Sequence, residues 1–356
     1  MKILAIESTC DETAAAVVES CGAGVRVISN VVASSVLMHQ KYGGIVPEVA
    51  AREQIKSIIP VITEAVGEDK ENIQAIAVSY GPGLMGSLLV GVESAKALAW
   101  AWKKPLLQVN HMAAHIFANW IIKENLNRFP IRSGMTSDEV PEFPAVGLVV
   151  SGGHTDLVLM KSTKDWKWIG GTRDDAVGEA FDKAARLLGL PYPGGPEIQK
   201  AVERAIENNF QFSIFNDHKY KLPRPLLNED NLDMSFSGLK AAIAKIVTEL
   251  GKIDEETRDL LALEFSEAVT EILVKKTMKA VEMYKPKSVL LAGGVAANKQ
   301  LREGLRLAVE NIGIKFFCPE LKYCGDNAAM VGATAIISPR EVKPVELKPD
   351  PSVATV

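Results

Sequence analysis

The chain has 356 residues, 47% of them hydrophobic and 24% charged, which is the balance of an ordinary soluble globular protein. This length allows one large domain or two ordinary domains, each with its own core. The net charge of −4 argues against a protein that binds RNA unaided, so an RNA substrate would require a local basic patch or a partner.

The cysteines and the N-terminus favour a cytoplasmic location. Cys10, Cys21, Cys318 and Cys324 include no C-x-x-C pair, which argues against a cysteine zinc site or a redox motif. So few cysteines in a long chain are typical of a reducing compartment. The opening MKILAIESTCDE predicts a first β-strand rather than a signal peptide, and no run of 18 apolar residues predicts a membrane span.

The first third of the chain alternates predicted strands and helices. Short apolar runs bounded by turn residues predict strands, and apolar residues at helical spacing predict helices. Pro47 is well placed in the first turn of one such helix. Strands are expected at 2–8, 14–18, 25–33, 73–79 and 106–110, and helices at 46–66, 84–102 and 111–123.

Residues 124–144 are polar and aperiodic and are interpreted as a linker or insertion. The opening pattern of strand, turn and strand then recurs at 145–160, with Ser151–Thr155 as the turn. The tail from Ser338 contains several prolines and is expected to lie on the surface or fray. Between residue 160 and the tail, we expect helices at 176–188, 196–208, 238–250, 255–284 and 326–337, strands at 288–291 and 315–318, and a loop at 216–233.

Two rounds of strand, turn and strand followed by β/α units indicate an α/β protein with two related lobes. The predicted domains are a first lobe at 1–123 joined by the C-terminal helix, the insertion at 124–144, a second lobe with helical insertions at 145–337, and the tail at 338–356. Glycine-rich turns from both lobes would converge on a ligand cleft between them.

His111 and His115 are four residues apart at the start of a predicted helix. This spacing places them on one helix face, about 6 Å apart. Two neutral imidazoles so placed can share one metal ion, although they can equally cap and pack a helix. A zinc protease of the H-E-x-x-H type needs glutamate after the first histidine, and Met112 stands there.

A two-histidine centre needs at least one further ligand. Asp326 begins the apolar helix predicted near the C-terminus, where an N-cap role would explain it equally well. Asp175 and Asp182 are other carboxylates that remain open as ligands.

Three glycine-rich turns follow predicted strands, at 81–83, 151–153 and 293–294. Glycine lets a backbone approach a phosphate closely, and helix N-termini supply N–H donors. A tight turn explains each of them singly, but three in one chain favour a nucleotide-like ligand. None matches a P-loop or a dinucleotide fingerprint.

Together these motifs resemble the TsaD family, also called Gcp, Kae or OSGEP, whose members are tRNA threonylcarbamoyladenosine transferases. The matching segments occur in family order, cover nearly the whole chain and look more bacterial than archaeal. They are ILAIESTCDETAAAVV, YGGIVPEVAAREQ, SYGPGLMGSLLVG, NHMAAHI, LVVSGGHTDL, DDAVGEAFDKAARLLGLPYPGGP, SFSGLKAA, AGGVAANKQLR and YCGDNAAMVG.

The resemblance implies the actin/Hsp70-like (ASKHA) ATPase fold and one divalent metal ion, Fe²⁺ or alternatively Zn²⁺, on His111, His115 and Asp326. Two departures stand out: residues 124–144 are longer than usual, and Gln199 occupies a position where some relatives carry a nucleotide-contacting glutamate. The residues implied to bind threonylcarbamoyl-AMP or an adenine nucleotide are Val149, Val150, Ser151, Gly152, Gly153, Asp182, Gly195 and Asn298.

The implied reaction transfers the threonylcarbamoyl group from L-threonylcarbamoyladenylate to N6 of adenosine 37 in tRNAs that read codons beginning with A, and releases AMP. A carboxylate near the first hairpin, Asp11 or Glu12, is expected to take the proton from the attacking amine. The implied partners are tRNA, a TsaB-like paralogue, a TsaE-like ATPase and a separate adenylate-forming enzyme that makes the L-threonylcarbamoyladenylate. Residues 37–54, or the helices near them, are expected to contribute to the interface with the paralogue.

Three other functions fit parts of the pattern. An ATPase or small-molecule kinase of the same fold would leave the histidine pair without a use. A metalloprotease is disfavoured by Met112, as above. A non-catalytic scaffold for a tRNA-modifying complex would not need a complete set of metal ligands.

Overall fold

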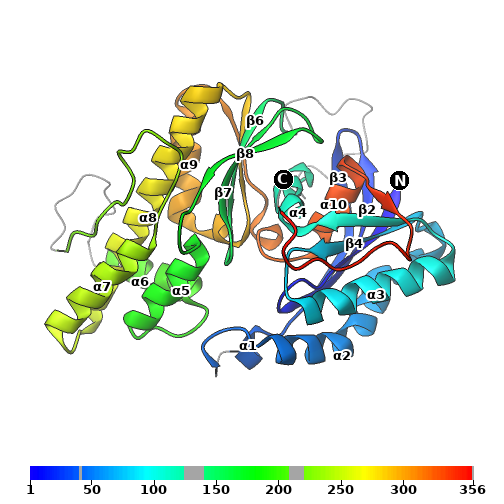
Figure 1. Ribbon diagram of the computed structural model, residues 1–356, viewed down its shortest axis with the longest axis horizontal. Helices are drawn as coiled ribbons and strands as arrows, with labels where there is room; N and C mark the ends of the chain where they lie inside the picture. Colours follow the sequence, from blue (N-terminus) through cyan, green and yellow to red (C-terminus); the bar gives the residue numbers. More distant parts are fainter. Residues whose placement is uncertain (40–41, 124–139, 208–219, 355–356) are drawn as a thin grey trace. The chain divides into compact units, whose positions relative to one another are not determined.

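The computed structural model describes residues 1–39, 42–123, 140–207 and 220–354. It comprises two compact units (Figure 1). Unit 1 contains Met1–Glu142, Ser162–Asp165 and Pro319–Val356, and unit 2 contains Phe143–Lys161 and Trp166–Cys318. Most of the expected insertion, residues 124–139, and part of the expected loop, residues 216–219, lie outside the described residues.

Unit 1 is built on a six-stranded mixed sheet with the order β11-β5-β4-β1-β2-β3. β1, β2 and β3 form an antiparallel meander, while β4 and β5 continue parallel to β1. The strands are β1 (Lys2–Glu7), β2 (Glu12–Cys21), β3 (Gly24–Ser34), β4 (Ala75–Gly81), β5 (Leu106–Asn110) and β11 (Glu341–Val342).

Helices cover both faces of this sheet, so strand residues are apolar in both directions. In β1, Ile3 and Ala5 pack in the core formed with α10, whereas Leu4 and Ile6 pack in the core formed with α2 and α3. The helices are α1 (Val36–His39), α2 (Pro47–Val66), α3 (Met85–Trp102), α4 (His111–Phe117) and α10 (Ala328–Ile337), with short 3₁₀ turns at Asp69–Asn72, Ala118–Trp120 and Leu321–Tyr323.

The segment after Ser338 differs from the expectation of a surface or frayed tail. β11 pairs antiparallel with β5, Leu347 is buried, and the Asp350 amide donates to the carbonyl of Tyr80 over 2.8 Å. The physical reason is that the outer edge of β5 presents unpaired backbone groups, which this segment satisfies. Its prolines therefore do not prevent it from joining the sheet.

Unit 2 repeats the arrangement with a five-stranded sheet in the order β10-β9-β6-β7-β8. Again a three-stranded antiparallel meander is extended by two parallel strands, which confirms the predicted duplication and the α/β fold. The strands are β6 (Ala145–Val150), β7 (Thr155–Met160), β8 (Trp166–Gly171), β9 (Ser288–Ala292) and β10 (Lys315–Phe317), and the helices are α5 (Val177–Leu187), α6 (Gly194–Glu207), α7 (Ser237–Leu250), α8 (Glu255–Tyr284) and α9 (Lys299–Glu310), with a 3₁₀ turn at Gly294–Ala297.

The long helix α8 forms the centre of the helical part of unit 2, where it packs against α6 and α9. Its buried face carries charged side chains that are paired: Arg204 of α6 contacts Asp259, and Arg224 contacts Glu264. Of the helices in the described ranges, none is both long and apolar enough to cross a lipid bilayer.

Candidate functional site

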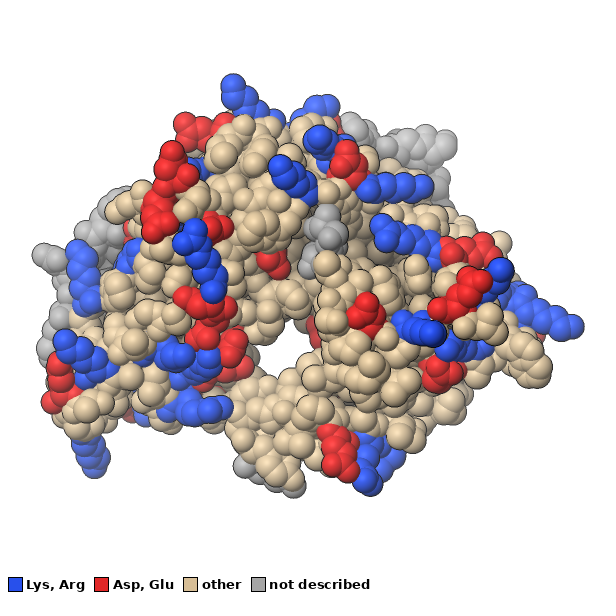
Figure 2. All heavy atoms as spheres, viewed as in Figure 1, with Lys and Arg blue, Asp and Glu red and all other residues tan. Residues whose placement is uncertain are grey.

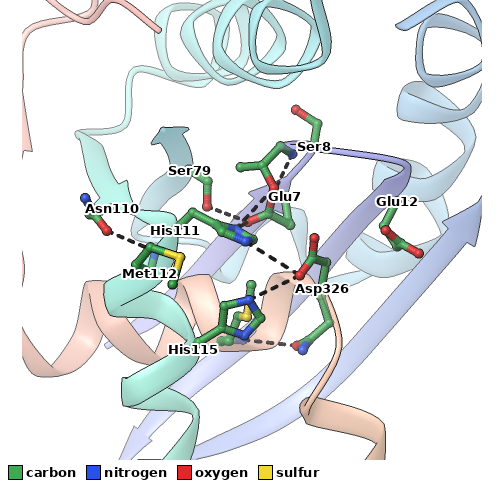
Figure 3. Close-up of polar contacts among 12 residues, drawn as sticks. Glu7, Ser8, Glu12, Ser79, Asn110, His111, Met112, His115 and Asp326 are labelled. Atoms are coloured by element: carbon green, nitrogen blue, oxygen red, sulfur yellow. Dashed lines mark hydrogen bonds and ion pairs between the residues drawn. The ribbon is translucent and has the colours of Figure 1, made fainter. Parts of the chain in front are cut away.

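The three residues proposed as metal ligands converge in unit 1 (Figure 3). His111 and His115 lie on one face of α4, and Asp326 comes from the turn before α10. Their ligand atoms all lie within 4.8 Å of one another. The Nε2 atoms of His111 and His115 are 3.6 Å and 3.2 Å from Oδ1 of Asp326. These distances suit three ligands of one cation.

Neighbouring residues, rather than the proposed ligands, cap the two helices. Asn110 is the N-cap of α4, where its Oδ1 accepts from the Met112 and Ala113 amides over 2.9 and 3.1 Å. Asn327 is the N-cap of α10, where its Oδ1 accepts from the Met330 amide over 3.1 Å. Neither histidine nor Asp326 is therefore needed as the N-cap of a helix.

His115 provides the test of whether this centre fits a cation. Within the part of the chain that the structure describes, both of its ring nitrogens are buried and lack a hydrogen-bond partner. Its 3.2 Å approach to Asp326 is not aligned as a hydrogen bond. A buried imidazole with no partner is costly, and a cation on its lone pair would satisfy it. Two imidazoles and one carboxylate are a donor set that Zn²⁺ and Fe²⁺ both accept.

The charges around His111 also favour a positive centre. Burial would lower the pKa of His111, but the carboxylates of Glu7 and Asp326 outweigh it and raise the pKa to about 9. Burial would likewise raise the pKa of Asp326, but His111 and His115 lower it to about 2. Asp326 is partly exposed while both histidines are buried, so solvent reaches the centre on the carboxylate side.

Glu7 is a further charged residue beside this centre, and it is not among the site residues expected from the sequence. It is fully buried at the end of β1, and its Oε2 lies 3.1 Å from Nδ1 of His111. The Ser79 hydroxyl donates to the same oxygen over 2.5 Å, and the Thr9 amide donates to Oε1 over 2.7 Å. The available signal was a charged side chain at a core position of an otherwise apolar strand.

The proposed proton acceptors, Asp11 and Glu12, lie at the turn between β1 and β2. Asp11 is buried, and its carbonyl accepts from the amide and hydroxyl of Ser35. Glu12 accepts from the Ser34 hydroxyl over 3.1 Å. Burial and the negative charge of Asp326 raise the pKa of Glu12 to about 10, so without a cation nearby Glu12 is protonated at neutral pH. The role of both residues as bases stays a prediction.

Asp175, which remained open as a metal ligand, is engaged elsewhere. Its two carboxylate oxygens contact Nζ of Lys183 over 2.7 Å and Nζ of Lys240 over 3.1 Å. These lysines hold the pKa of Asp175 below its usual range although burial opposes them. Asp175 therefore joins α5 to α7 within unit 2.

Unit 2 contains a cavity of about 460 Å³, a volume suited to a nucleotide-sized ligand. Four of the predicted substrate-binding residues line it, namely Gly152, Asp182, Gly195 and Asn298. Ser151 and Gly153 flank Gly152 in the turn between β6 and β7, whereas Val149 and Val150 are fully buried in β6. The other lining residues are Gly178, Phe181, Pro193, Pro196, Gln199, Gly294, Val295 and Ala297.

The polar side chains of this cavity form hydrogen bonds with the residues around it. Asp182 accepts from the Gly194 amide over 2.7 Å, and burial raises its pKa. Asn298 is the N-cap of α9, where its Oδ1 accepts from the Leu301 amide over 2.9 Å. Gln199 donates to Glu203 over 3.2 Å. Gln199, where a departure from the family was expected, lines this cavity.

Both glycines of the turn at 81–83 pack against backbone, whereas each of the other two turns has a glycine beside open space. A Cβ atom at Gly81 would lie 1.8 Å from the Asp350 carbonyl oxygen, and one at Gly83 would lie 2.6 Å from the Thr9 carbonyl oxygen. By contrast, the space beside Gly152 and Gly294 is open within 4 Å. The first turn therefore needs glycine for packing against its own chain, and its expected part in phosphate binding has no support here.

The sequence matches the family described as "TsaD: tRNA N6-adenosine threonylcarbamoyltransferase" over residues 26–333. The tRNA N6-adenosine threonylcarbamoyltransferase of Moorella thermoacetica is 46% identical over 94% of this chain and 90% of its own length. The protein of the same name from Syntrophomonas wolfei is 43% identical over 99% and 98%. Two solved HypF structures share the fold, with TM-scores of 0.55 and 0.54 at 12% and 15% identity; they match 95% and 94% of this chain, which spans 46% and 47% of theirs.

Proposed function

The chain belongs to the TsaD family of tRNA N6-adenosine threonylcarbamoyltransferases, and from this premise we propose its substrates and its mechanism. The donor is L-threonylcarbamoyladenylate, the acceptor is N6 of adenosine 37 in tRNAs that read codons beginning with A, and AMP leaves. The observation that carries the proposal is the convergence of His111, His115 and Asp326 in a chain of this family.

We assign His111, His115 and Asp326 to one divalent cation, Fe²⁺ or Zn²⁺. Three protein ligands leave coordination positions open, as in catalytic rather than structural sites. When bound, the cation supplies positive charge that polarises a phosphate or carbonyl oxygen of the substrate. The two buried histidines exclude water from their side of the centre, and Asp326 keeps the other side accessible.

The cavity of unit 2 is assigned to the adenylate half of the donor. Gly152 and Gly294 leave open space for a phosphate or ribose beside the backbone. Asp182 and Asn298 are the polar side chains available to orient the nucleoside. Because AMP is already a good leaving group, positioning and charge stabilisation can carry much of the rate enhancement.

The amine of adenosine 37 forms its new bond to the carbamoyl carbon, the bond from that carbon to the phosphate oxygen of AMP breaks, and the amine loses one proton. We assign that proton to the carboxylate of Asp11 or Glu12. Glu12 serves only when it is ionised, which its raised pKa opposes until positive charge is present nearby.

We propose that the paralogous TsaB-like subunit binds the outer face of α1, α2 and α3. This face carries more exposed apolar side chains than isolated surface residues would explain. They are Leu37, Met38, Ile55, Ile59, Met85 and Leu89. This face combines part of the expected interface, residues 37–54, with the helices near it.

The chain's own charge does not favour tight RNA binding. On the face shown in Figure 2, Lys and Arg side chains are interspersed with Asp and Glu, and the net charge is −4. Such a surface gives little phosphate attraction. We therefore propose that tRNA affinity arises in the assembly with the TsaB-like subunit and a TsaE-like ATPase, while a separate enzyme supplies the adenylate.

Reconstitution tests the function directly. The full chain is incubated with threonine, bicarbonate, ATP, the adenylate-forming enzyme, the two partner proteins and tRNA, and the nucleosides are analysed by mass. We expect N6-threonylcarbamoyladenosine, and we expect His111→Ala or Asp326→Asn to reduce it by roughly 100-fold or more because a three-ligand centre loses one ligand. Modification and metal content both unchanged in His111→Ala would contradict the site, and phosphorylation of a small molecule without modified tRNA would favour the kinase alternative.

A further inference from the structure

A buried carboxylate lies directly behind the first metal ligand. We propose that Glu7 is a positioning residue that holds His111 with its proton on Nδ1, so that the Nε2 lone pair is presented to the metal together with His115 and Asp326. Glu7 would thereby set the affinity of the centre for its cation. The inference rests on the metal centre of the proposed function and adds a residue to it.

Strand alternation explains why Glu7 faces this centre. Ile3 and Ala5 point to the side of the sheet covered by α4 and α10, and Glu7 is the next residue of β1 on that side. The register of β1 with β4 pairs Ile6 with Val78, so Ser79 follows beside Glu7. A carboxylate and its hydroxyl donor thus occupy neighbouring core positions, where apolar side chains are the rule.

The hydrogen bonds around Glu7 fix the direction of its contact with His111. Oε1 accepts from the Thr9 amide, and Oε2 accepts from the Ser79 hydroxyl. An ionised carboxylate can only accept, so Nδ1 of His111, 3.1 Å from Oε2, must be the donor. In the neutral imidazole that metal binding requires, the other nitrogen, Nε2, then carries the lone pair, and it lies 3.6 Å from Asp326 (Figure 3).

The two histidines are not equivalent in this respect. His111 has a carboxylate on the nitrogen that faces away from Asp326, together with the Thr9 hydroxyl at 3.2 Å. Nδ1 of His115 has no hydrogen-bond partner among the described residues. Partners of this kind orient a ligating histidine, and their loss typically weakens metal binding 10- to 100-fold. His111 is therefore the ligand whose ring is oriented by hydrogen bonds with Glu7 and Thr9.

Metal affinity provides the first test. The full chain is stripped of metal and titrated with Zn²⁺ against a competing chelator, as wild type and as Glu7→Gln, Ser79→Ala and His111→Ala. We expect Glu7→Gln to weaken Zn²⁺ binding about 10- to 100-fold. Ser79→Ala should weaken it less, because Glu7 remains but loses the hydroxyl that orients it, and this variant keeps the test informative if Glu7→Gln does not fold.

A matched control separates positioning from general destabilisation. Val17 is fully buried in the same sheet but packs on the opposite face, with α2 and α3. Val17→Ala should lower the unfolding temperature and leave Zn²⁺ affinity unchanged. The proposal is overturned if Glu7→Gln binds Zn²⁺ as tightly as wild type while His111→Ala does not. If His111→Ala also binds normally, the metal centre of the proposed function fails as well.

The proton position gives a readout that a purely structural role for Glu7 would not affect. In the Zn²⁺-loaded protein with ¹⁵N-labelled histidine, we expect His111 to show a protonated Nδ1 and a metal-bound Nε2. The Nδ1 proton should exchange with solvent faster in Glu7→Gln than in wild type. Metal bound at Nδ1 of His111, or an exchange rate that Glu7→Gln leaves unchanged, would overturn the assignment.

Discussion

At the residue scale, His111 lies between two carboxylates, and its protonation controls the stability of the metal-free centre. Glu7 and Asp326 raise its pKa from 6.5 to about 9. The folded state therefore binds the imidazolium proton more tightly than the unfolded state. This contribution, on the order of 3 kcal/mol, is fully present below about pH 6.5 and is lost as the pH rises through about 9.

This predicts an unusual pH profile for the metal-free protein. Its free energy of unfolding in urea should be lower at about pH 9.5 than at about pH 6, and His111→Gln should remove most of that difference. Saturating Zn²⁺ should abolish or invert the slope, because the metal needs a neutral imidazole and competes with the proton. An equal slope in His111→Gln and wild type would assign the effect to other groups.

The same residues show how far a sequence can predict a site. Spacing alone suggested that His111 and His115 share a helix face, and the family motif supplied Asp326. A charged residue in an apolar strand marks Glu7 as unusual, but its role could not be inferred from the sequence, because that role depends on which side of β1 it faces and on Ser79 of another strand. Side-chain partners from separate elements become visible only once the register of the strands is known.

At the element scale, the loop from Ser8 to Glu12 is held by the two helices behind it. Nε2 of Gln54 in α2 lies 3.3, 3.0 and 3.0 Å from the carbonyl oxygens of Ser8, Cys10 and Glu12. The Ser87 hydroxyl of α3 donates to the Cys10 carbonyl over 3.0 Å. Helices that expose the proposed partner face therefore also fix the loop that carries the proposed proton acceptors.

Gln54→Leu should release this loop. It leaves buried carbonyl oxygens without their donor, which costs about 1–3 kcal/mol of unfolding free energy. We expect the rate of tRNA modification to fall at least about 10-fold, because misplacement of catalytic groups is costly, while Zn²⁺ affinity stays within about threefold. The exposed Lys164 of unit 1 lies outside α1, α2 and α3 and supplies the control, since Lys164→Ala should change neither quantity. A modification rate that falls no more than the stability loss explains would contradict this role for the loop.

Helices and strands were predicted correctly where one face of the element, or the whole element, is buried. The apolar strands of both meanders and the amphipathic α5 and α6 follow from their periodicity. β8 was not expected, because WKWIGG at a sheet edge is half-exposed and shows no alternation. α4 ends at Phe117, earlier than the predicted 123, and a 3₁₀ turn follows; such boundaries depend on tertiary contacts that a local pattern does not contain.

At the scale of the whole chain, the duplication was visible in the sequence because each half repeats a meander followed by β/α units. The addition of the C-terminal helix to the first lobe was also expected, and α10 does lie in unit 1. The last strand of its sheet was not expected. β11 comes from the far end of the chain and is too short to produce a pattern.

The C-terminal segment should therefore contribute measurably to the stability of unit 1. Residues beyond Lys348 supply three contacts: the Asp350 amide with the Tyr80 carbonyl, the Pro351 carbonyl with the Gly83 amide, and the Ala354 carbonyl with the Asn110 side chain. Truncation after Lys348 removes them while retaining β11 and the buried Leu347. At about 0.5–1.5 kcal/mol for each hydrogen bond, the unfolding free energy should fall by roughly 2–4 kcal/mol.

Urea unfolding of the truncated and full chains measures this loss. Val345 is 84% exposed in the same segment, so Val345→Ser should leave stability unchanged and serves as the control. Because Asn110 also caps α4, which carries both histidines, the truncation should weaken Zn²⁺ binding as well, by less than Glu7→Gln does. Unchanged stability after truncation would contradict the prediction, because it would show that these contacts do not stabilise unit 1. A loss of stability with unchanged Zn²⁺ affinity would show that the segment stabilises the sheet but does not support the metal centre.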